Sequence, residues 1–329
     1  MIISKTPARL PIGGGGTDLP SFYTKFGGFF ISAAINKYFY NAVNKRFEDQ
    51  IKLSYFKTEN IDVDRIDEIE HPIIREVLKL LNIKDNIEIS TIAEIPSRSG
   101  MGSSGSFTVG LLNALHAYKK QNVPAKTLAE EAFKVEAEIL KEPVGKQDHY
   151  IAAFGGITAF TIDKDGSVTV EPLKLTNETI SDLENNILLF YTGIQRKASD
   201  ILTVQNQSAQ KNDKVVLECL QKIKSIGVDV MDSLNSGDLN RFGELLNTHW
   251  NVKKMMSYKI SNDIIDNWYG LGMKSGALGG KLMGAGGGGF LMFYCDRNKN
   301  QLRRAMIKEG LKECPFKFDF DGTKIMVNL

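Results

Sequence analysis

The sequence predicts an α+β protein with two domains that share a cleft. Its 329 residues exceed the length of one average domain. Strand patterns dominate the first third, helical periodicity dominates residues 197–274, and strand patterns return at both ends of the second half. This order favours a second domain with helices on one face of a sheet. The polar stretch 176–186 marks the boundary, which gives domains 1–180 and 181–329.

The first domain opens with β-branched and aromatic runs and then becomes helical. We expect residues 51–56 to form a hairpin with the strand before them. The predicted strands are 2–9, 29–47, 51–56, 86–95, 157–162 and 168–175, and the predicted helices are 73–81, 107–118 and 125–140.

The second domain begins with a short apolar run typical of a buried strand, at residues 187–191. A helical stretch with interruptions follows, from about residue 197 to 274. The remaining predicted elements are strands at 289–294, 316–320 and 324–327 and a helix at 301–311.

The composition argues against several classes of function. The 41 basic and 39 acidic residues are interspersed and leave a net charge of +2, which gives no electrostatic case for nucleic acid. No apolar run reaches the roughly 18 residues that span a bilayer, and the N-terminus lacks the pattern of a secretion signal. Three scattered cysteines without CxxC spacing indicate a reducing compartment. We therefore expect a cytoplasmic protein without a membrane or nucleic-acid partner.

The segment from Pro96 to Ser106, PSRSGMGSSGS, carries the strongest functional signal, and we call it the serine loop. It lies between a predicted strand and a predicted helix. Its glycines let a ligand approach the backbone closely, and free N–H groups with the helix dipole attract anions such as phosphate. The hydroxyls of Ser103, Ser104 and Ser106 can cap the helix or face phosphate or magnesium. A serine-capped helix start without a ligand is the alternative interpretation.

A run of four glycines, Gly13 to Gly16, follows the first predicted strand. Arg9 precedes the run, and the pair Thr17–Asp18 follows it. Accessible backbone beside a short carboxylate suits a polyhydroxyl ligand, whose hydroxyls need donors and acceptors at close range. A plain turn is the alternative.

A second glycine-rich run, residues 284–289, directly precedes a predicted core strand. Glycines are entropically costly inside a fold, so such a run requires a structural reason. We expect a tight turn between strands, or close packing of its backbone against a ligand or the serine loop. Asp148 is a further carboxylate, which taken alone is more often a capping residue than a catalytic one.

Together these segments resemble the GHMP small-molecule kinases, which carry three motifs in this order. Residues 7–18 resemble the substrate motif, residues 96–104 the phosphate-binding PxxxGLGSS loop, and residues 281–289 the C-terminal glycine motif. The resemblance extends over almost the whole chain. It implies the GHMP kinase fold: an N-terminal domain like domain 2 of ribosomal protein S5, a C-terminal ferredoxin-like domain, and ATP with Mg²⁺ between them.

The resemblance also implies roles for individual residues. Asp148 matches the catalytic aspartate, and Arg9 matches the basic residue that faces the transferred phosphoryl group. Ser104 and Glu138 match the magnesium ligands, with Glu136 as the fallback because the spacing differs by one residue from mevalonate kinases. The implied ATP-binding residues are Pro96, Ser99, Gly100, Met101, Gly102, Ser103, Ser104, Gly105 and Ser106, and the implied substrate-binding residues are Gly13, Gly14, Gly15, Gly16, Thr17, Asp18, Asp148, Gly286, Gly287 and Arg196.

The first motif differs from that of galactokinases, which carry Gly-Glu-His-Thr-Asp where this chain has Gly14-Gly15-Gly16-Thr17-Asp18. Together with residues 143–148 and 191–196, it resembles the subgroup of D-glycero-D-manno-heptose 7-phosphate kinases and L-fucose kinase domains. This implies ATP-dependent phosphorylation of the anomeric C1 hydroxyl of the heptose 7-phosphate. The 1,7-bisphosphate would serve nucleotide-activated heptose synthesis for capsule or cell-surface polysaccharide.

Several points stay open at this stage. The alternatives are an L-fucose or other hexose 1-kinase, a decarboxylase of the mevalonate-diphosphate type, and a non-catalytic sensor of sugar and ATP. A homodimer is the candidate assembly. Arg196 is the first choice for holding the 7-phosphate, and the further candidates are Lys197, Arg98 and Lys25. His149 has no assigned role, because it stands where many relatives have Gln or Asn.

Overall fold

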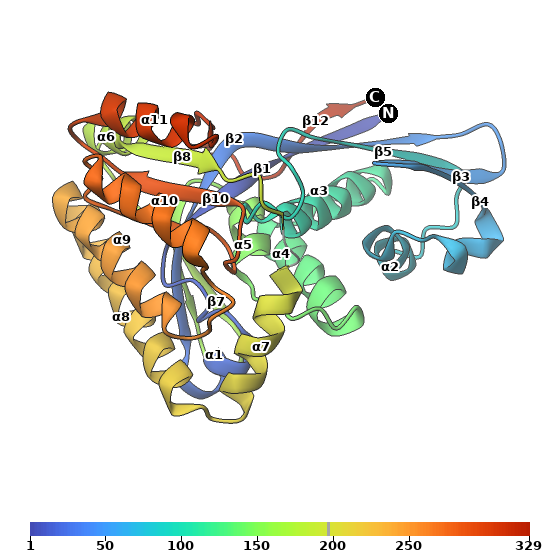
Figure 1. Cartoon of the computed structure of the whole chain (residues 1–329). Coiled ribbons are helices and arrows are strands. Elements are labelled where there is room, and N and C mark those ends of the chain that lie inside the picture. The colour runs from blue at the N-terminus through green and yellow to red at the C-terminus, as the bar shows by residue number, and fades with distance from the viewer. Residues whose placement is uncertain (196–197) are drawn as a thin grey trace.

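The computed structural model describes residues 1–195 and 198–329 and contains two β-sheets with helices packed around them (Figure 1). The larger sheet has eight strands and the smaller sheet has four. Helix α3 lies between the distal part of the larger sheet, at β3 and β4, and the helices that surround the smaller sheet (Figure 1). The two chain ends lie side by side, and the Met1 amino group donates a hydrogen bond to the Leu329 carbonyl at 3.0 Å.

The larger sheet is organised around one long strand. Its strand order is β12-β1-β2-β5-β3-β4, with β6 and β7 branching from β2. The first part of β2 pairs with β6 and the last part pairs with β5, while β1 runs along both parts. The strands are β1 (Ile2–Gly13), β2 (Gly28–Lys45), β3 (Gln50–Ser54), β4 (Thr58–Asp62), β5 (Ile87–Ala93), β6 (Ile157–Ile162), β7 (Val168–Pro172) and β12 (Lys324–Asn328).

Helix α3 is the central helix of this part of the chain. It is apolar around most of its circumference, and it is buried against β1, β2, α4 and α5. A π-helical turn directly follows α4. The helices here are α1 (Pro20–Phe26), α2 (Pro72–Leu80), α3 (Ser103–Tyr118), α4 (Ala125–Phe133) and α5 (Gln147–Phe154), with a 3₁₀ segment η1 (Val63–Glu68) and the π-helical turn η2 (Lys134–Ile139).

The smaller sheet is antiparallel, with the order β11-β8-β10-β9. Its central strands are buried on both faces. Alternate side chains of β8 and β10 enter different core clusters, because successive residues of a strand point to opposite faces. The elements are β8 (Ile187–Tyr191), β9 (Gly279–Leu282), β10 (Phe290–Tyr294) and β11 (Lys312–Glu313), and the helices are α6 (Asn177–Asn186), α7 (Ala198–Gln210), α8 (Lys214–Ser236), α9 (Leu239–Lys254), α10 (Asp263–Lys274) and α11 (Lys299–Lys308).

Three strand predictions differ from the structure. Strand β3 does not form a hairpin with β2, because β5 lies between them; β3 pairs antiparallel with β4 and parallel with β5. Residues 316–320 form no strand and make a single bridge, between Ile35 and Phe318. Strand β12 pairs with β1 and so belongs to the larger sheet. The division of the chain at residue 180 remains a prediction.

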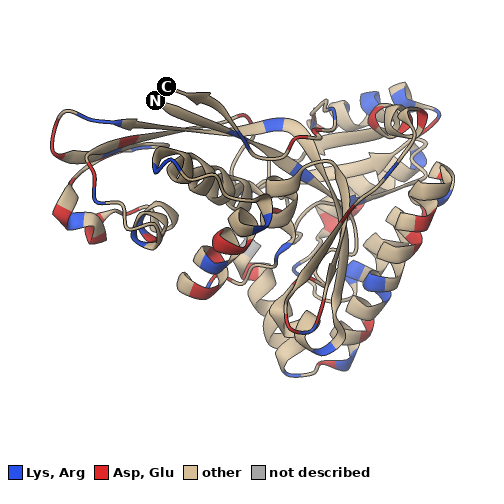
Figure 2. Ribbon diagram, turned by 180° about the vertical axis from the view of Figure 1, so that it is seen from behind, with Lys and Arg blue, Asp and Glu red and all other residues tan. Residues whose placement is uncertain are grey.

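Basic and acidic residues are interspersed over the helices and loops (Figure 2). Within residues 1–195 and 198–329, no helix combines the length and apolar character needed to cross a membrane.

Candidate active site

A cavity of about 840 Å³ brings the three glycine-rich segments together. Its wall includes residues of the serine loop and α5 on one side, and residues of α7, α9 and β9 on the other. The sequence motifs therefore converge on one concave site, which is the usual form of a small-molecule site.

The serine loop ends at the N-terminus of α3, where Gly102 is the N-cap residue. Gly100 and Gly102 have φ values of 81° and 76°, a left-handed conformation that favours glycine. The first-turn N–H groups of α3 lack intrahelical partners and, with the helix dipole, form an anion site. The loop residues that line the cavity are Ser97, Arg98, Gly100, Gly102, Ser103 and Ser104.

The other predicted residues of this loop do not line the cavity. Ser106 is buried, and its hydroxyl donates to the Pro7 carbonyl at 2.8 Å. Ser99 and Met101 are also buried. The absence of a side chain at Gly105 lets α5 approach, because a Cβ there would lie 2.7 Å from the Asp148 Cβ. These residues shape the loop, and Pro96 lies on its exposed outer part.

The C-terminal glycine run packs backbone to backbone against the serine loop, as one of the two sequence interpretations expects. A Cβ on Gly284 would lie 2.8 Å from the Gly100 Cα, and one on Gly289 would overlap the Ser99 carbonyl. The residues of this run that line the cavity are Gly284 and Ala285. The predicted contacts Gly286 and Gly287 instead pack against the Ile260 segment.

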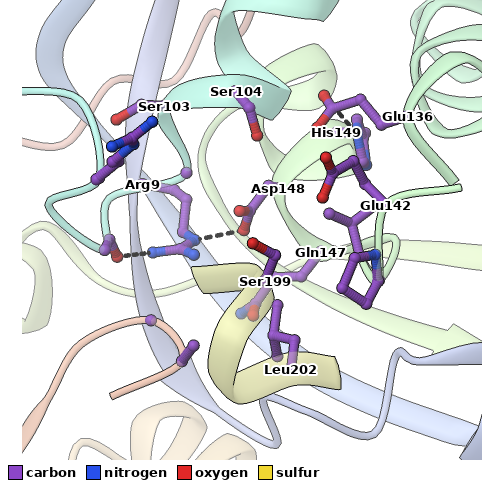
Figure 3. Close-up of a pocket in the computed structure, with 18 of the residues that line it drawn as sticks. Arg9, Ser103, Ser104, Glu136, Glu142, Gln147, Asp148, His149, Ser199 and Leu202 are labelled. Atoms are coloured by element: carbon purple, nitrogen blue, oxygen red, sulfur yellow. Dashed lines mark hydrogen bonds and ion pairs between the residues drawn. The ribbon is translucent and has the colours of Figure 1, made fainter. Parts of the chain in front are cut away.

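Arg9 and Asp148 form an ion pair at the centre of the cavity (Figure 3). The Arg9 Nε lies 2.7 Å from Asp148 Oδ1, and Arg9 Nη1 also donates to the Gly100 carbonyl. Arg9 comes from β1, and Asp148 comes from the first turn of α5, where the helix dipole favours a carboxylate. The Asp148 side chain is 31% exposed, whereas that of Arg9 is 6% exposed. The carboxylate is therefore held by a fixed cation and faces the open cavity.

Asp18 also lines the cavity, beside Gly15 and Gly16. Its carboxylate accepts hydrogen bonds from the Gly16 N–H at 3.0 Å and the Gln147 N–H at 2.9 Å. Burial raises the pKa of Asp18 above its ordinary value, and these backbone hydrogen bonds partly oppose that shift. Gly13, Gly14 and Thr17 do not line the cavity; the buried Thr17 hydroxyl bonds to the Gly14 and Phe29 carbonyls and fixes the turn.

Of the two candidate glutamates, Glu136 lines the cavity, and Glu138 is exposed outside it. The structure thus favours the fallback, Glu136, and the role of magnesium ligand stays a prediction. The physical reason is helical periodicity: Glu136 continues the buried face of α4, seven residues after Ala129, whereas Glu138 is two residues further on and faces away.

The surroundings of Glu136 fit a divalent cation. Its Oε1 accepts from the Thr108 hydroxyl at 2.8 Å and is paired with His149 Nε2 at 3.1 Å. Both contacts use Oε1, which leaves Oε2 for another ligand. The Ser104 hydroxyl also faces this part of the cavity (Figure 3). No cluster of three or more His, Cys, Asp or Glu side chains suited to a metal occurs among the described residues, but Mg²⁺ beside phosphates needs only one or two protein ligands.

The structure gives His149, which had no role assigned from the sequence, a role in positioning Glu136. His149 is 1% exposed, and its ring holds the Glu136 carboxylate. Burial disfavours the charged imidazolium, but the Glu136 carboxylate outweighs this effect and raises the pKa of His149 above its ordinary value.

The two ends of the cavity carry residues that sequence reasoning missed. One end has an apolar and aromatic wall formed by Tyr55, Phe56, His71 and Phe107. The other end has basic groups formed by the buried His249 and Lys281 and the half-buried Lys253. The spacing of four between His249 and Lys253 on one helix, and a lysine inside the buried strand β9, were the available signals.

Two of the four predicted phosphate-binding residues lie within the part of the chain that the structure describes, and they lie apart. Arg196 and Lys197 lie outside the described residues. Lys25 donates to Asn212 Oδ1 at 2.8 Å and does not line the cavity. Arg98 lines the cavity as part of the serine loop.

Comparison with known proteins connects this geometry to a family. The model of the GHMP kinase N-terminal domain matches residues 71–156, and that of the GHMP kinase C-terminal domain matches residues 230–312. The chain is 30% identical to the D-glycero-alpha-D-manno-heptose 7-phosphate kinase of Campylobacter jejuni, over 98% of both chains. It is 26% identical to the galactokinase of Pyrococcus furiosus, over 96% of this chain and 95% of that one.

Solved structures agree with this result. A D-glycero-D-manno-heptose 1-phosphate kinase from Bacteroides thetaiotaomicron superposes with a TM-score of 0.83 at 25% identity, over 99% of both chains. The fold predicted from the three motifs is thereby confirmed. With two domain models matched in the expected order, and a relative similar over its full length, this chain belongs to the GHMP kinase family.

Proposed function

We propose that this protein transfers the γ-phosphoryl group of ATP to the anomeric C1 hydroxyl of D-glycero-D-manno-heptose 7-phosphate, giving the 1,7-bisphosphate. The observation that carries the proposal is the Arg9–Asp148 pair at the N-terminus of α3, in a chain 30% identical to a heptose 7-phosphate kinase over its whole length. The reaction would take place in the cytoplasm and supply nucleotide-activated heptose for cell-surface polysaccharide. A homodimer remains a prediction.

The cavity offers ATP a site for the base and a site for the phosphates. Tyr55, Phe56 and His71 provide an apolar and aromatic wall at the end near β3 and α2, which suits the adenine ring. The first-turn N–H groups of α3 lie further along the cavity and suit the phosphates. The γ-phosphoryl group would then lie close to Arg9 and Asp148, and the sugar beyond it, near Gly15, Gly16 and Asp18.

In this arrangement Asp148 orients the C1 hydroxyl and accepts its proton. Its Oδ1 is engaged by Arg9, so Oδ2 is the oxygen free to face the substrate. An anomeric hydroxyl is more acidic than an ordinary alcohol, so positioning contributes as much as base strength. Arg9 keeps a fixed positive charge where negative charge accumulates during transfer. Asp18 and the Gly16 backbone would bind further sugar hydroxyls.

Glu136 Oε2 and the Ser104 hydroxyl are the groups that would hold Mg²⁺. Bound there, the cation would neutralise charge on the phosphates. Thr108 and His149 keep the Glu136 carboxylate in place by binding its other oxygen.

ADP release measured across a panel of sugars and sugar phosphates, with NMR of each product, tests the proposal. We expect the highest kcat/KM with D-glycero-D-manno-heptose 7-phosphate, and a new phosphate on C1. A higher kcat/KM with L-fucose or another free hexose would overturn the substrate assignment. Sugar binding without any ADP release would identify a sensor instead.

A further inference from the structure

A cluster of basic groups lines the end of the cavity formed by α9 and β9, and the chemistry above does not use it. Lys281 and His249 are 2% and 3% exposed. The Lys281 ammonium donates to the Ile12 carbonyl at 3.0 Å and lies 3.2 Å from His249 Nδ1. The half-buried Lys253 donates to the Gly284 carbonyl. We call Lys253, Lys281 and His249 the basic cluster.

Within residues 1–195 and 198–329, no carboxylate forms an ion pair with either lysine of the basic cluster. Arg9, in contrast, pairs with Asp148. Burial, with the nearby charge of Arg9, lowers the pKa of Lys253 to about 8. Burial and the positive charges of Lys253 and Arg9 also lower the pKa of Lys281 well below its ordinary value. Buried charges are costly unless they are paired, so this arrangement is incomplete without an anion.

His249 supplies an independent sign of a missing ligand. Its Nε2 is buried and has no hydrogen-bond partner among the described residues. Burial lowers the pKa of His249 well below its ordinary value, so the ring is neutral. When Lys281 donates to Nδ1, the single ring proton lies on Nε2. The residue then presents one free N–H donor beside two ammonium groups.

The position of the basic cluster favours the sugar substrate over the nucleotide. The nucleotide phosphates are accounted for by the N-terminus of α3, with Glu136 and Ser104 beside it. Lys281 adjoins the first glycine run, because it binds the carbonyl of Ile12, directly before Gly13, while Lys253 binds Gly284 of the C-terminal glycine run. The basic cluster also lies at the opposite end of the cavity from the aromatic wall, since α9 and β3 are on opposite sides of α3 (Figure 1).

We propose that Lys253, Lys281 and His249 form the subsite for a phosphate group carried by the sugar substrate at the end remote from its C1 hydroxyl. This inference rests on the proposed function. A phosphomonoester dianion has three oxygens, which can accept from the two ammonium groups and the His249 N–H. The subsite would make the enzyme prefer phosphorylated sugars.

The test compares D-glycero-D-manno-heptose 7-phosphate with the same heptose lacking the phosphate, using wild type, Lys253→Met and Lys281→Met. Hydrogen bonds to charged groups correspond to about a 10- to 100-fold change in affinity. We expect the ratio of kcat/KM for the phosphorylated over the free sugar to fall by that factor in each variant. The KM for ATP should change much less. Lys254→Met is the matched control, because Lys254 pairs with Asp266 outside the cavity, and its ratio should equal that of wild type.

Equal losses on both sugars would overturn the inference, because the lysines would then act at the transferred phosphoryl group, while the proposed function would stand. A wild-type enzyme that prefers another phosphorylated sugar would instead overturn the proposed function, and the same variants would test the subsite with that sugar. A second experiment measures inhibition of the wild-type enzyme by inorganic phosphate and so does not depend on the folding of a variant. We expect it to be competitive with the sugar phosphate, and competition with ATP alone would count against the subsite.

Discussion

Replacing Asp148 by asparagine removes a negative charge and a proton acceptor while preserving the shape of the side chain. The Arg9 Nε can still donate to the amide oxygen at the position that Oδ1 occupies, 2.7 Å away. The contact between Arg9 and the Gly100 carbonyl is also retained, so the serine loop keeps its support. The amide nitrogen then faces the substrate in place of Oδ2 and cannot accept the hydroxyl proton.

We therefore expect Asp148→Asn to lower kcat by roughly two to four decades, the range for loss of a general base. Coupled measurement of ADP release gives kcat, and calorimetry gives the affinity for ATP, which should change little. Asp148→Ala separates the two roles of the carboxylate, because alanine also removes the partner of Arg9. It should weaken the support of the serine loop as well as slow the reaction. A kcat for Asp148→Asn within tenfold of wild type would refute the assignment of Asp148 as the proton acceptor.

Ser104→Ala and Glu136→Gln should each raise the Mg²⁺ concentration needed for half-maximal rate, whereas Glu138→Gln should not. If a Mg²⁺ titration shows the larger effect for Glu138→Gln, then Glu138 and not Glu136 is the metal ligand. Arg9→Ala should reduce kcat more than it weakens ATP binding, which single-turnover kinetics beside calorimetry can check. The lowered pKa of Lys253, about 8, predicts a pH effect on folding. Between pH 8 and the ordinary lysine pKa the unfolded chain binds more protons, so this residue destabilises the native state below pH 8 and the penalty fades as the pH rises. In urea unfolding, any stability advantage of Lys253→Met over wild type should be largest below pH 8 and shrink above it; an advantage that grows with pH would contradict the sign.

The sequence predicted correctly those elements whose hydrophobic pattern lies entirely within the element. The strand predicted at 187–191 coincides with β8, and the apolar run after the serine loop belongs to α3. Residues 316–320 alternate as a strand should, yet they form only one bridge, because strand formation depends on a neighbouring strand being available. Strand β9 was missed because it begins with two glycines, which disfavour strands in isolation.

The residues of the candidate site show the same difference between local and long-range signals. Arg9 and the serine loop belong to compact motifs, and the family resemblance carried by those motifs implied that Asp148 lies beside them, as it does in the cavity. The choice of Glu138 followed motif spacing, whereas Glu136 lies on the same helical face as the buried Ala129 and Phe133 and so reaches the cavity. Lys253 and Lys281 belong to different elements and meet only through the packing of α9 on β9.

The glycine-rich segments gain a common explanation from this packing. The serine loop has to present free N–H groups toward the cavity, so its own backbone cannot be stabilised by a regular ladder. Arg9 supports it from β1, through the Gly100 carbonyl. The C-terminal glycine run supports it from the smaller sheet, at distances that a side chain would prevent. Loop geometry is thus fixed from both sheets before any ligand binds, which lets its donors act without reorganisation. A side chain in either glycine segment would therefore impair the reaction by displacing backbone donors, even where it touches no substrate.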